Sequence, residues 1–169
     1  MRTFLDRLYD AAAYLAAFFL AGTLAMVLLG IVGRLLDWFV PGTDACAGYC
    51  MAAAGFLALA HTLKRGEHIR VSLLLERAGV RARRALELWA LAVATLLAGA
   101  FAWYSVRLVV QSWQFNDVST GNDATPLWIP QLAMAIGTVV LLVAFVDELL
   151  GEWRGTRRRK VPEEALHHE

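Results

Sequence analysis

The chain has 169 residues, of which 59% are hydrophobic and 18% are charged, and its formal net charge is +1. Soluble domains are typically about 45–50% apolar, so this composition indicates a membrane protein. The near-neutral charge gives no reason to expect nucleic acid or another strongly charged partner. Four long apolar runs take up most of the sequence and leave no room for a separate soluble domain. We therefore predict a single all-α integral membrane domain over residues 1–169.

The N-terminal segment predicts a short helix at the membrane surface, followed by the first transmembrane span. Residues 1–10 carry apolar side chains at helical spacing on one side, which suits an amphipathic interfacial helix. The apolar run 11–33 exceeds the about 20 residues that a span requires. It is also longer than the apolar core of a cleaved signal peptide, which is about 7–15 residues. We expect it to be an uncleaved span.

The second span is predicted over residues 44–63, which are rich in small residues. Cys46 and Cys50 share a helix face, and a disulfide within one turn would strain the backbone, so we expect both to be packing residues. Three small residues form a stripe on which another helix can approach closely, unless they only reflect general alanine enrichment. This small-residue stripe consists of Gly48, Ala52 and Gly55.

The connection over residues 64–84 is predicted to be an arm that lies along the membrane surface. After a polar start it carries apolar side chains on one helix face and charged ones on the other, which is typical of an interfacial amphipathic helix. His68 and Arg70 stand at the beginning of this arm. They form either a solvated turn or a candidate site for a lipid phosphate.

The third and fourth spans are predicted over residues 85–114 and 126–150, and a polar, turn-rich loop over 115–125 joins them. Two prolines fall in the first turns of the fourth span, where a helix tolerates proline best. The remaining residues, 151–169, are charged and are predicted to be a loosely ordered tail.

One arginine lies inside the predicted third span. Arg107 comes late in that span, and Gln111 follows one helical turn later on the same face. Arg107 either extends its side chain to the lipid headgroups or makes a polar contact with a partner membrane protein.

Basic residues near the span ends predict that both termini lie in the cytoplasm. Two basic residues precede the first span, seven lie between spans two and three, and five lie in the tail. Only Arg34 and Arg107 remain for the other side or for the membrane. Because cytoplasmic segments are enriched in Lys and Arg, we predict four spans with both termini inside.

The centres of the four spans contain no Asp, Glu, Lys or His. Charged side chains within spans usually mark ion or substrate pathways, so we do not expect a complete proton-coupled pump. We find no catalytic, cofactor-binding or metal-ligating pattern, and we therefore expect neither an enzyme nor a bound cofactor. The residues indicate a subunit of a larger assembly.

Three classes of function remain open on the residues alone. A membrane anchor of a redox complex would bind haem or quinone, and as a haem anchor it would require His61 as a ligand. A small multidrug exporter acting as a homo-oligomer would ordinarily need a carboxylate within a span. A membrane scaffold of another type requires neither feature.

Two stretches resemble a known family. In residues 60–74, basic residues are followed by His68-Ile69-Arg70-Val71 between spans two and three. In residues 121–137, Pro126-Leu127-Trp128-Ile129-Pro130 opens span four. With the length and the four-span layout, they resemble the small membrane subunit, of the DctQ type, of tripartite ATP-independent periplasmic (TRAP) transporters. Ser72 stands where this family often has aspartate.

The resemblance implies a scaffold role in a bacterial inner membrane. Members of this family accompany a much larger membrane subunit that carries the substrate and sodium sites, and a periplasmic binding protein delivers an organic anion. Selectivity is then expected to reside in those two partners. On this interpretation we hypothesise that Asp117, Asn122 and Asp123 lie on the outer face, near the docked binding protein.

Overall fold

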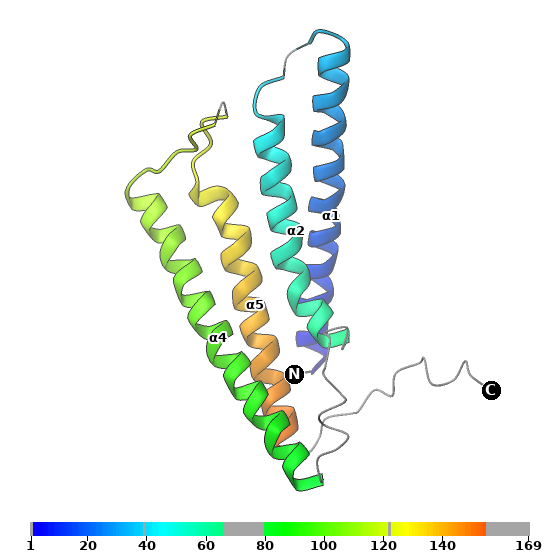
Figure 1. The fold of residues 1–169 in the computed structure, drawn as a ribbon, viewed down its shortest axis with the longest axis vertical. Helices are drawn as coiled ribbons and strands as arrows, with labels where there is room; N and C mark the ends of the chain where they lie inside the picture. The colour runs from blue at the N-terminus through cyan, green and yellow to red at the C-terminus, as the bar shows by residue number, and fades with distance from the viewer. Residues whose placement is uncertain (1, 39, 66–79, 122, 155–169) are drawn as a thin grey trace, which may run out of the picture.

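The computed structural model describes residues 2–38, 40–65, 80–121 and 123–154. Four helices, each long and apolar enough to cross a membrane, account for its regular structure, which confirms the predicted all-α, four-span fold. These helices are α1 (Arg2–Leu35), α2 (Thr43–Arg65), α4 (Val80–Gln114) and α5 (Trp128–Trp153) (Figure 1). Most of the predicted arm falls in residues 66–79, which lie outside the described residues.

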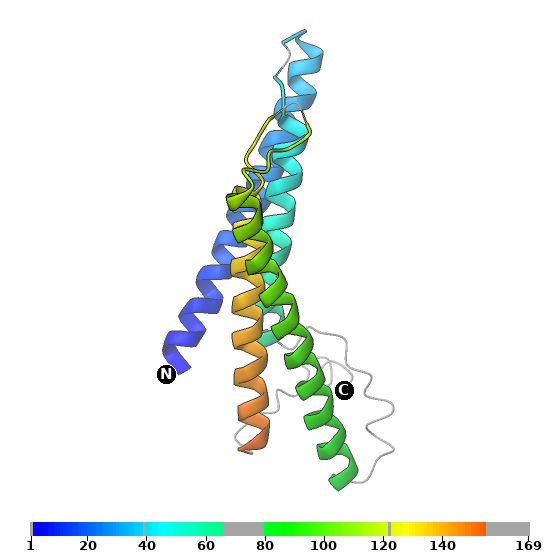
Figure 2. The ribbon, with the colours of Figure 1, turned by 90° about the vertical axis from the view of Figure 1, so that its left-hand side faces the viewer.

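The helices form a layer one helix thick, in the spatial order α1, α2, α5, α4 (Figure 1, Figure 2). In this layer α1 packs on α2, α2 packs on α5, and α5 packs on α4. Each edge helix therefore has a full neighbour on one side only. Large apolar side chains on α1 and α4 stay exposed as a result, among them Phe18 at 70% and Trp103 at 71%. In a bilayer such side chains face lipid or another protein.

Helix α1 is one continuous helix from Arg2 to Leu35, so the prediction of a separate interfacial helix over residues 1–10 is wrong. The reason is tertiary packing. Tyr9 is only 2% exposed and packs with apolar residues of α2 and α5, which keeps the first turns in line with the rest of the helix. At 34 residues, α1 is about 51 Å long and exceeds the hydrocarbon thickness of about 30 Å.

Small residues bring α1 and α2 together. A Cβ added at Gly30 would lie 3.1 Å from the Thr43 hydroxyl oxygen, and one added at Gly22 would lie 3.5 Å from the Cys50 sulfur. Cys50 therefore packs against α1, and neither Cys50 nor Cys46 forms a disulfide. Van der Waals contact between close backbones is a main source of helix association in membranes, and small residues allow it.

Helices α2 and α5 approach most closely at Gly137. A Cβ at this position would lie 2.5 Å from the carbonyl oxygen of Phe56 and 2.9 Å from its Cβ, so only glycine fits. The next residue, Thr138, is fully buried, and its hydroxyl donates a hydrogen bond to the Ala135 carbonyl at 3.0 Å. The hydroxyl is thereby satisfied within α5, and α2 can pack directly on this face.

Helix α4 presents a small-residue face to α5. Ala98, Ala102, Ser105 and Ser112 are the buried side chains of α4. Gly99 lies next to this face. A Cβ added there would lie 3.7 Å from the Leu142 side chain, which is an ordinary van der Waals contact distance. Gly99 is thus less tightly enclosed than Gly137.

Replacing Gly137 by alanine is expected to destabilise the protein by about 1–3 kcal/mol, the usual cost of overpacking. The added methyl collides with the Phe56 backbone, which cannot rotate away as a side chain can. The measurement is the Tm of the detergent-solubilised protein. Gly99→Ala is the matched control, because it adds the same methyl at a site with room and should leave Tm unchanged or raised. Equal losses in both variants would contradict the predicted clash.

Candidate partner-binding surfaces

The layer has two ends with different polar structures. The end where α1 begins and α5 finishes is called the terminal end here, and the end with segments 36–42 and 115–127 is called the loop end (Figure 1). The centres of the helices between them carry no acidic residue, lysine or histidine. Polar contacts that join different helices therefore concentrate near the two ends.

At the terminal end, a lysine joins three helices. Lys64 of α2 places its Nζ 3.0 Å from the Asp147 carboxylate of α5 and 3.5 Å from the Asp6 carboxylate of α1. The same nitrogen lies 5.1 Å from the centre of the Tyr9 ring, a cation–π distance. Asp6, Tyr9, Lys64 and Asp147 are called the terminal-end ion cluster. Because the Lys64 side chain is only 26% exposed, its charge is screened less than that of a surface lysine.

A second contact between α1 and α2 at this end involves His61. Its Nδ1 lies 3.6 Å from a carboxylate oxygen of Asp10. In the redox-anchor alternative His61 would need a second histidine as a haem ligand, and no other histidine falls among the described residues. His61 therefore has a structural partner in α1, and the described part of the chain offers no opposing ligand.

From the sequence alone Lys64 indicates only the orientation of the chain, and the ion cluster is not predicted. Its members lie far apart in the chain, and only packing shows that they meet. A usable signal was nevertheless present. Asp6, Lys64 and Asp147 each lie near the same predicted side of the membrane, at the boundary of a long apolar run, where unpaired charges are costly.

At the loop end, segment 115–127 folds back on itself. Val118 and Pro126 form an antiparallel bridge. The Ser119 amide donates to the Thr125 carbonyl at 2.8 Å, and the Leu127 amide donates to the Asp117 carbonyl at 2.9 Å. The loop therefore has a defined backbone shape rather than only the polar composition seen in the sequence.

Asp123 connects this loop to the other half of the molecule. Its carboxylate accepts a hydrogen bond from the Ser119 hydroxyl at 2.9 Å and one from the Tyr49 hydroxyl of α2 at 3.1 Å. Gly42, with a φ of 79°, lets the loops approach, because a Cβ there would lie 3.0 Å from that of Asp123. The hydrogen bond between Tyr49 and Asp123 is called the Asp123 contact. It links the α1–α2 pair to the α4–α5 pair across the loop end.

The hydrogen bonds to Asp123 also fix its charge. The side chain of Thr125 contributes most, followed by Ser119, and with Tyr49 they lower the pKa of Asp123 from 3.8 to about 2 despite partial desolvation. The carboxylate is ionised at physiological pH and accepts hydrogen bonds from hydroxyl groups of this chain. Asp117, in contrast, is exposed, and Asn122 lies outside the described residues. The role of all three toward a binding protein remains a prediction.

The small-residue stripe on α2 faces away from the other described helices. Gly48, Ala52 and Gly55 are all exposed, and a Cβ at either glycine would meet no atom of the described chain within 4 Å. The stripe is therefore not used for packing within the described residues. None of the four described helices approaches the stripe, so a helix that packs on it would come from outside the described residues.

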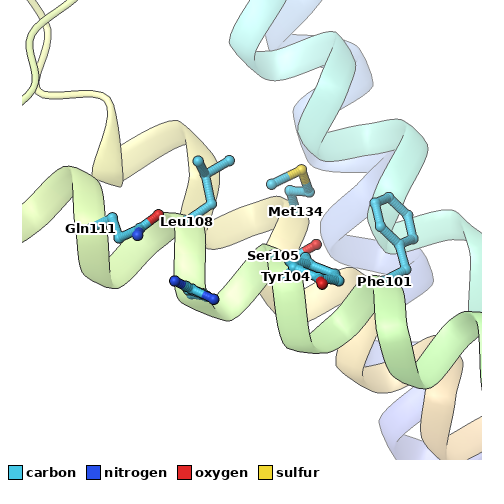
Figure 3. Close-up of a pocket in the computed structure, with 7 residues that line it drawn as sticks. Phe101, Tyr104, Ser105, Leu108, Gln111 and Met134 are labelled. Carbon is cyan, nitrogen blue, oxygen red and sulfur yellow. The ribbon is translucent and has the colours of Figure 1, made fainter.

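Arg107 and Gln111 both line one groove, as their spacing of one helical turn indicates. The groove has a volume of about 410 Å³ and runs along α4, with Met134 of α5 as its opposite wall (Figure 3). Its lining residues are Phe101, Tyr104, Ser105, Arg107, Leu108, Gln111 and Met134. The two remaining lipid candidates, His68 and Arg70, lie outside the described residues.

A second hollow, of about 540 Å³, lies at the loop end beside the turn that joins α1 and α2. It contains the ion pair between Arg34 and Asp44, whose nearest atoms are 3.4 Å apart. Both side chains are highly exposed, at 78% and 87%, so this pair contributes little to stability.

Replacing Lys64 by methionine is expected to lower the free energy of unfolding by about 1–2 kcal/mol, because two carboxylates near the apolar core lose their cation. The measurement is the Tm of the purified protein in detergent. The double variant Lys64→Met/Asp147→Leu should recover part of the loss, since it removes the less exposed of the two unpaired carboxylates. Arg34→Met is the control and should change stability by less than about 0.5 kcal/mol. A loss in the control as large as in Lys64→Met would contradict this prediction.

Replacing Asp123 by alanine is expected to loosen segment 115–127, because the Ser119 and Tyr49 hydroxyls lose their acceptor. Hydrogen exchange at the Ser119 and Leu127 amides measures this loosening and should become faster. Asp117→Ala is the control, since its exposed side chain should leave the same amides protected. The pKa of Asp123 is lower in the folded protein, so acid acts like the substitution. The stabilisation that the ionised Asp123 provides is fully present above pH 3.8 and is lost as pH falls through about 2. Unchanged exchange in Asp123→Ala would refute the role of this contact.

Comparison with known proteins identifies the family. The family described as "Tripartite ATP-independent periplasmic transporters, DctQ component" matches residues 23–155, which include most of the four helices and both loop-end segments. A comparison with individually curated proteins found no match. The match covers most of the chain and agrees with the resemblance carried by residues 60–74 and 121–137. The chain belongs to the DctQ family, the small membrane component of TRAP transporters.

Proposed function

We propose that this chain is the scaffold subunit of a transporter that imports an organic anion with sodium. A large membrane subunit carries out the transport, and a periplasmic binding protein delivers the substrate. The family match over residues 23–155 carries this proposal, because the family is a transporter component rather than an enzyme. The chain itself is proposed to hold no cofactor.

The arrangement of charge supports a scaffold rather than a transport pathway. Transport sites at the bilayer midplane usually contain charged side chains or broken helices. Here the span centres carry no carboxylate, and the four described helices each run without a break. The ion cluster and the Asp123 contact tie helices together at the two ends instead. These contacts hold the helices in a fixed arrangement and do not form a pathway for a solute.

The exposed apolar faces of α1 and α4 and the small-residue stripe of α2 provide surface for the large subunit. A layer one helix thick leaves more apolar surface uncovered than a closed bundle of the same helices. Exposed glycines on a transmembrane helix allow another helix to approach closely. Together these features support the proposal that the chain functions beside a partner in the membrane.

We further propose that both termini lie in the cytoplasm of a bacterium whose inner membrane holds the protein. The bias of basic residues supports this orientation. The loop end then faces the periplasm, where the exposed Asp117 is positioned to contact the binding protein. A reporter that fluoresces only in the cytoplasm, fused to either terminus, tests the orientation, and a dark fusion would disprove it.

Purification of the tagged chain from its native membrane in mild detergent, followed by mass spectrometry, tests the function. We expect a much larger polytopic membrane protein at about one copy per copy of the chain. Recovery of the chain alone as a homo-oligomer would contradict the proposal. Recovery with redox subunits, and with the visible absorption of haem, would favour the redox-anchor alternative instead.

Asp117→Arg, compared with Asp37→Arg, refines this experiment. Both residues are exposed at the loop end, but only Asp117 belongs to the predicted binding-protein surface. We expect Asp117→Arg to reduce capture of the binding protein and to leave recovery of the large subunit unchanged. Asp37→Arg should affect neither. Normal capture by Asp117→Arg would remove that residue from the docking surface.

A further inference from the structure

The groove on α4 carries Arg107 and Gln111 toward one end, and mainly apolar or aromatic side chains along the rest of its length. Gln111 lies near the loop end of the groove, and Phe101 lies at the opposite end, with Leu108 and Met134 between them (Figure 3). Phe101 is held in place by Phe56 of α2, whose ring centre lies 6.0 Å away. Packing between helices therefore holds the Phe101 end of the groove in place.

Two polar groups beside the groove lack partners among the described residues. Arg107 is exposed and makes no hydrogen bond or ion pair within the described residues, although it lies about two turns inside the end of α4. Ser105 is only 2% exposed, and its hydroxyl has no hydrogen-bond partner in the described part of the chain. An unpaired cation is costly in a membrane, so a ligand that pairs with the exposed Arg107 would be stabilised.

The dimensions of the groove match one leaflet of a bilayer. From Gln111 to Phe101 the groove follows α4 for about 15 Å, which is half of the about 30 Å of hydrocarbon. Trp113 of α4, which is 65% exposed, lies beyond the polar end, where aromatic side chains mark the membrane interface. Arg107 is thus placed where its long side chain reaches the level of lipid phosphates.

We propose that this groove binds one phospholipid. Its phosphate is held by Arg107 and Gln111. One acyl chain runs along Leu108 and Phe101 toward the bilayer centre. A carboxylate from a partner protein is a weaker candidate, because it would satisfy Arg107 but would leave the apolar length of the groove unfilled.

Native mass spectrometry of the full chain, purified with whatever protein accompanies it, tests the proposal. After detergent washing, the sample is incubated with dioleoyl phosphatidylglycerol or with dioleoyl glycerol, which has the same acyl chains but no phosphate. We expect one phosphatidylglycerol per chain and about tenfold weaker retention of dioleoyl glycerol. Arg107→Leu should weaken phosphatidylglycerol retention about tenfold as well, whereas Arg107→Lys should keep most of it.

Two further variants distinguish specific binding in the groove from general attraction of lipid to positive charge. Leu108→Trp fills the exposed groove without removing Arg107 and should also reduce retention. Arg34→Leu removes the exposed loop-end arginine that lies outside the groove and should leave retention unchanged. Equal retention by the wild type and Arg107→Leu would overturn the proposal. Binding of inorganic phosphate in place of the lipid would also overturn it. A third contrary result is a wild-type complex that holds no lipid and loses its partner protein in Arg107→Leu.

Discussion

The close contact between α2 and α5 holds the molecule together, because it joins two helical pairs into one layer. Helix α1 packs on α2, and α4 packs on α5, so the central contact is the main connection between the pairs. Gly137 makes it possible by allowing the Phe56 backbone to lie where a side chain would otherwise be. Lipid tails are as apolar as leucine, so close packing must supply what the hydrophobic effect supplies in water.

Polar contacts add to this packing where the helices leave the apolar region. Lys64 ties α1, α2 and α5 at the terminal end, and the contact between Asp123 and Tyr49 ties the pairs at the loop end. Such contacts fix which residues lie opposite each other, which small apolar side chains alone specify poorly. Sliding of one pair along the other would break both. The two ends and the central glycine therefore restrain the same relative motion.

The sequence was sufficient for features that depend on one segment at a time. Apolar length predicted all four helices, and the spacing of Arg107 and Gln111 correctly put both on one face. Features that depend on tertiary packing were missed. The first ten residues looked like an interfacial helix because their pattern is amphipathic, yet burial of Tyr9 keeps them within α1. Likewise, no local pattern reveals that Lys64 pairs with Asp147, or that Asp123 accepts a hydrogen bond from Tyr49.

A layer of this kind suits the proposed scaffold role for a physical reason. A closed bundle buries its apolar surface internally and presents a narrow face to any neighbour. The open layer instead leaves the outer faces of α1 and α4 and the stripe of α2 available at once. A neighbour that changes shape during transport needs a support that does not change with it. The contacts at both ends and at Gly137 restrain the layer without an acidic residue, lysine or histidine in the span centres.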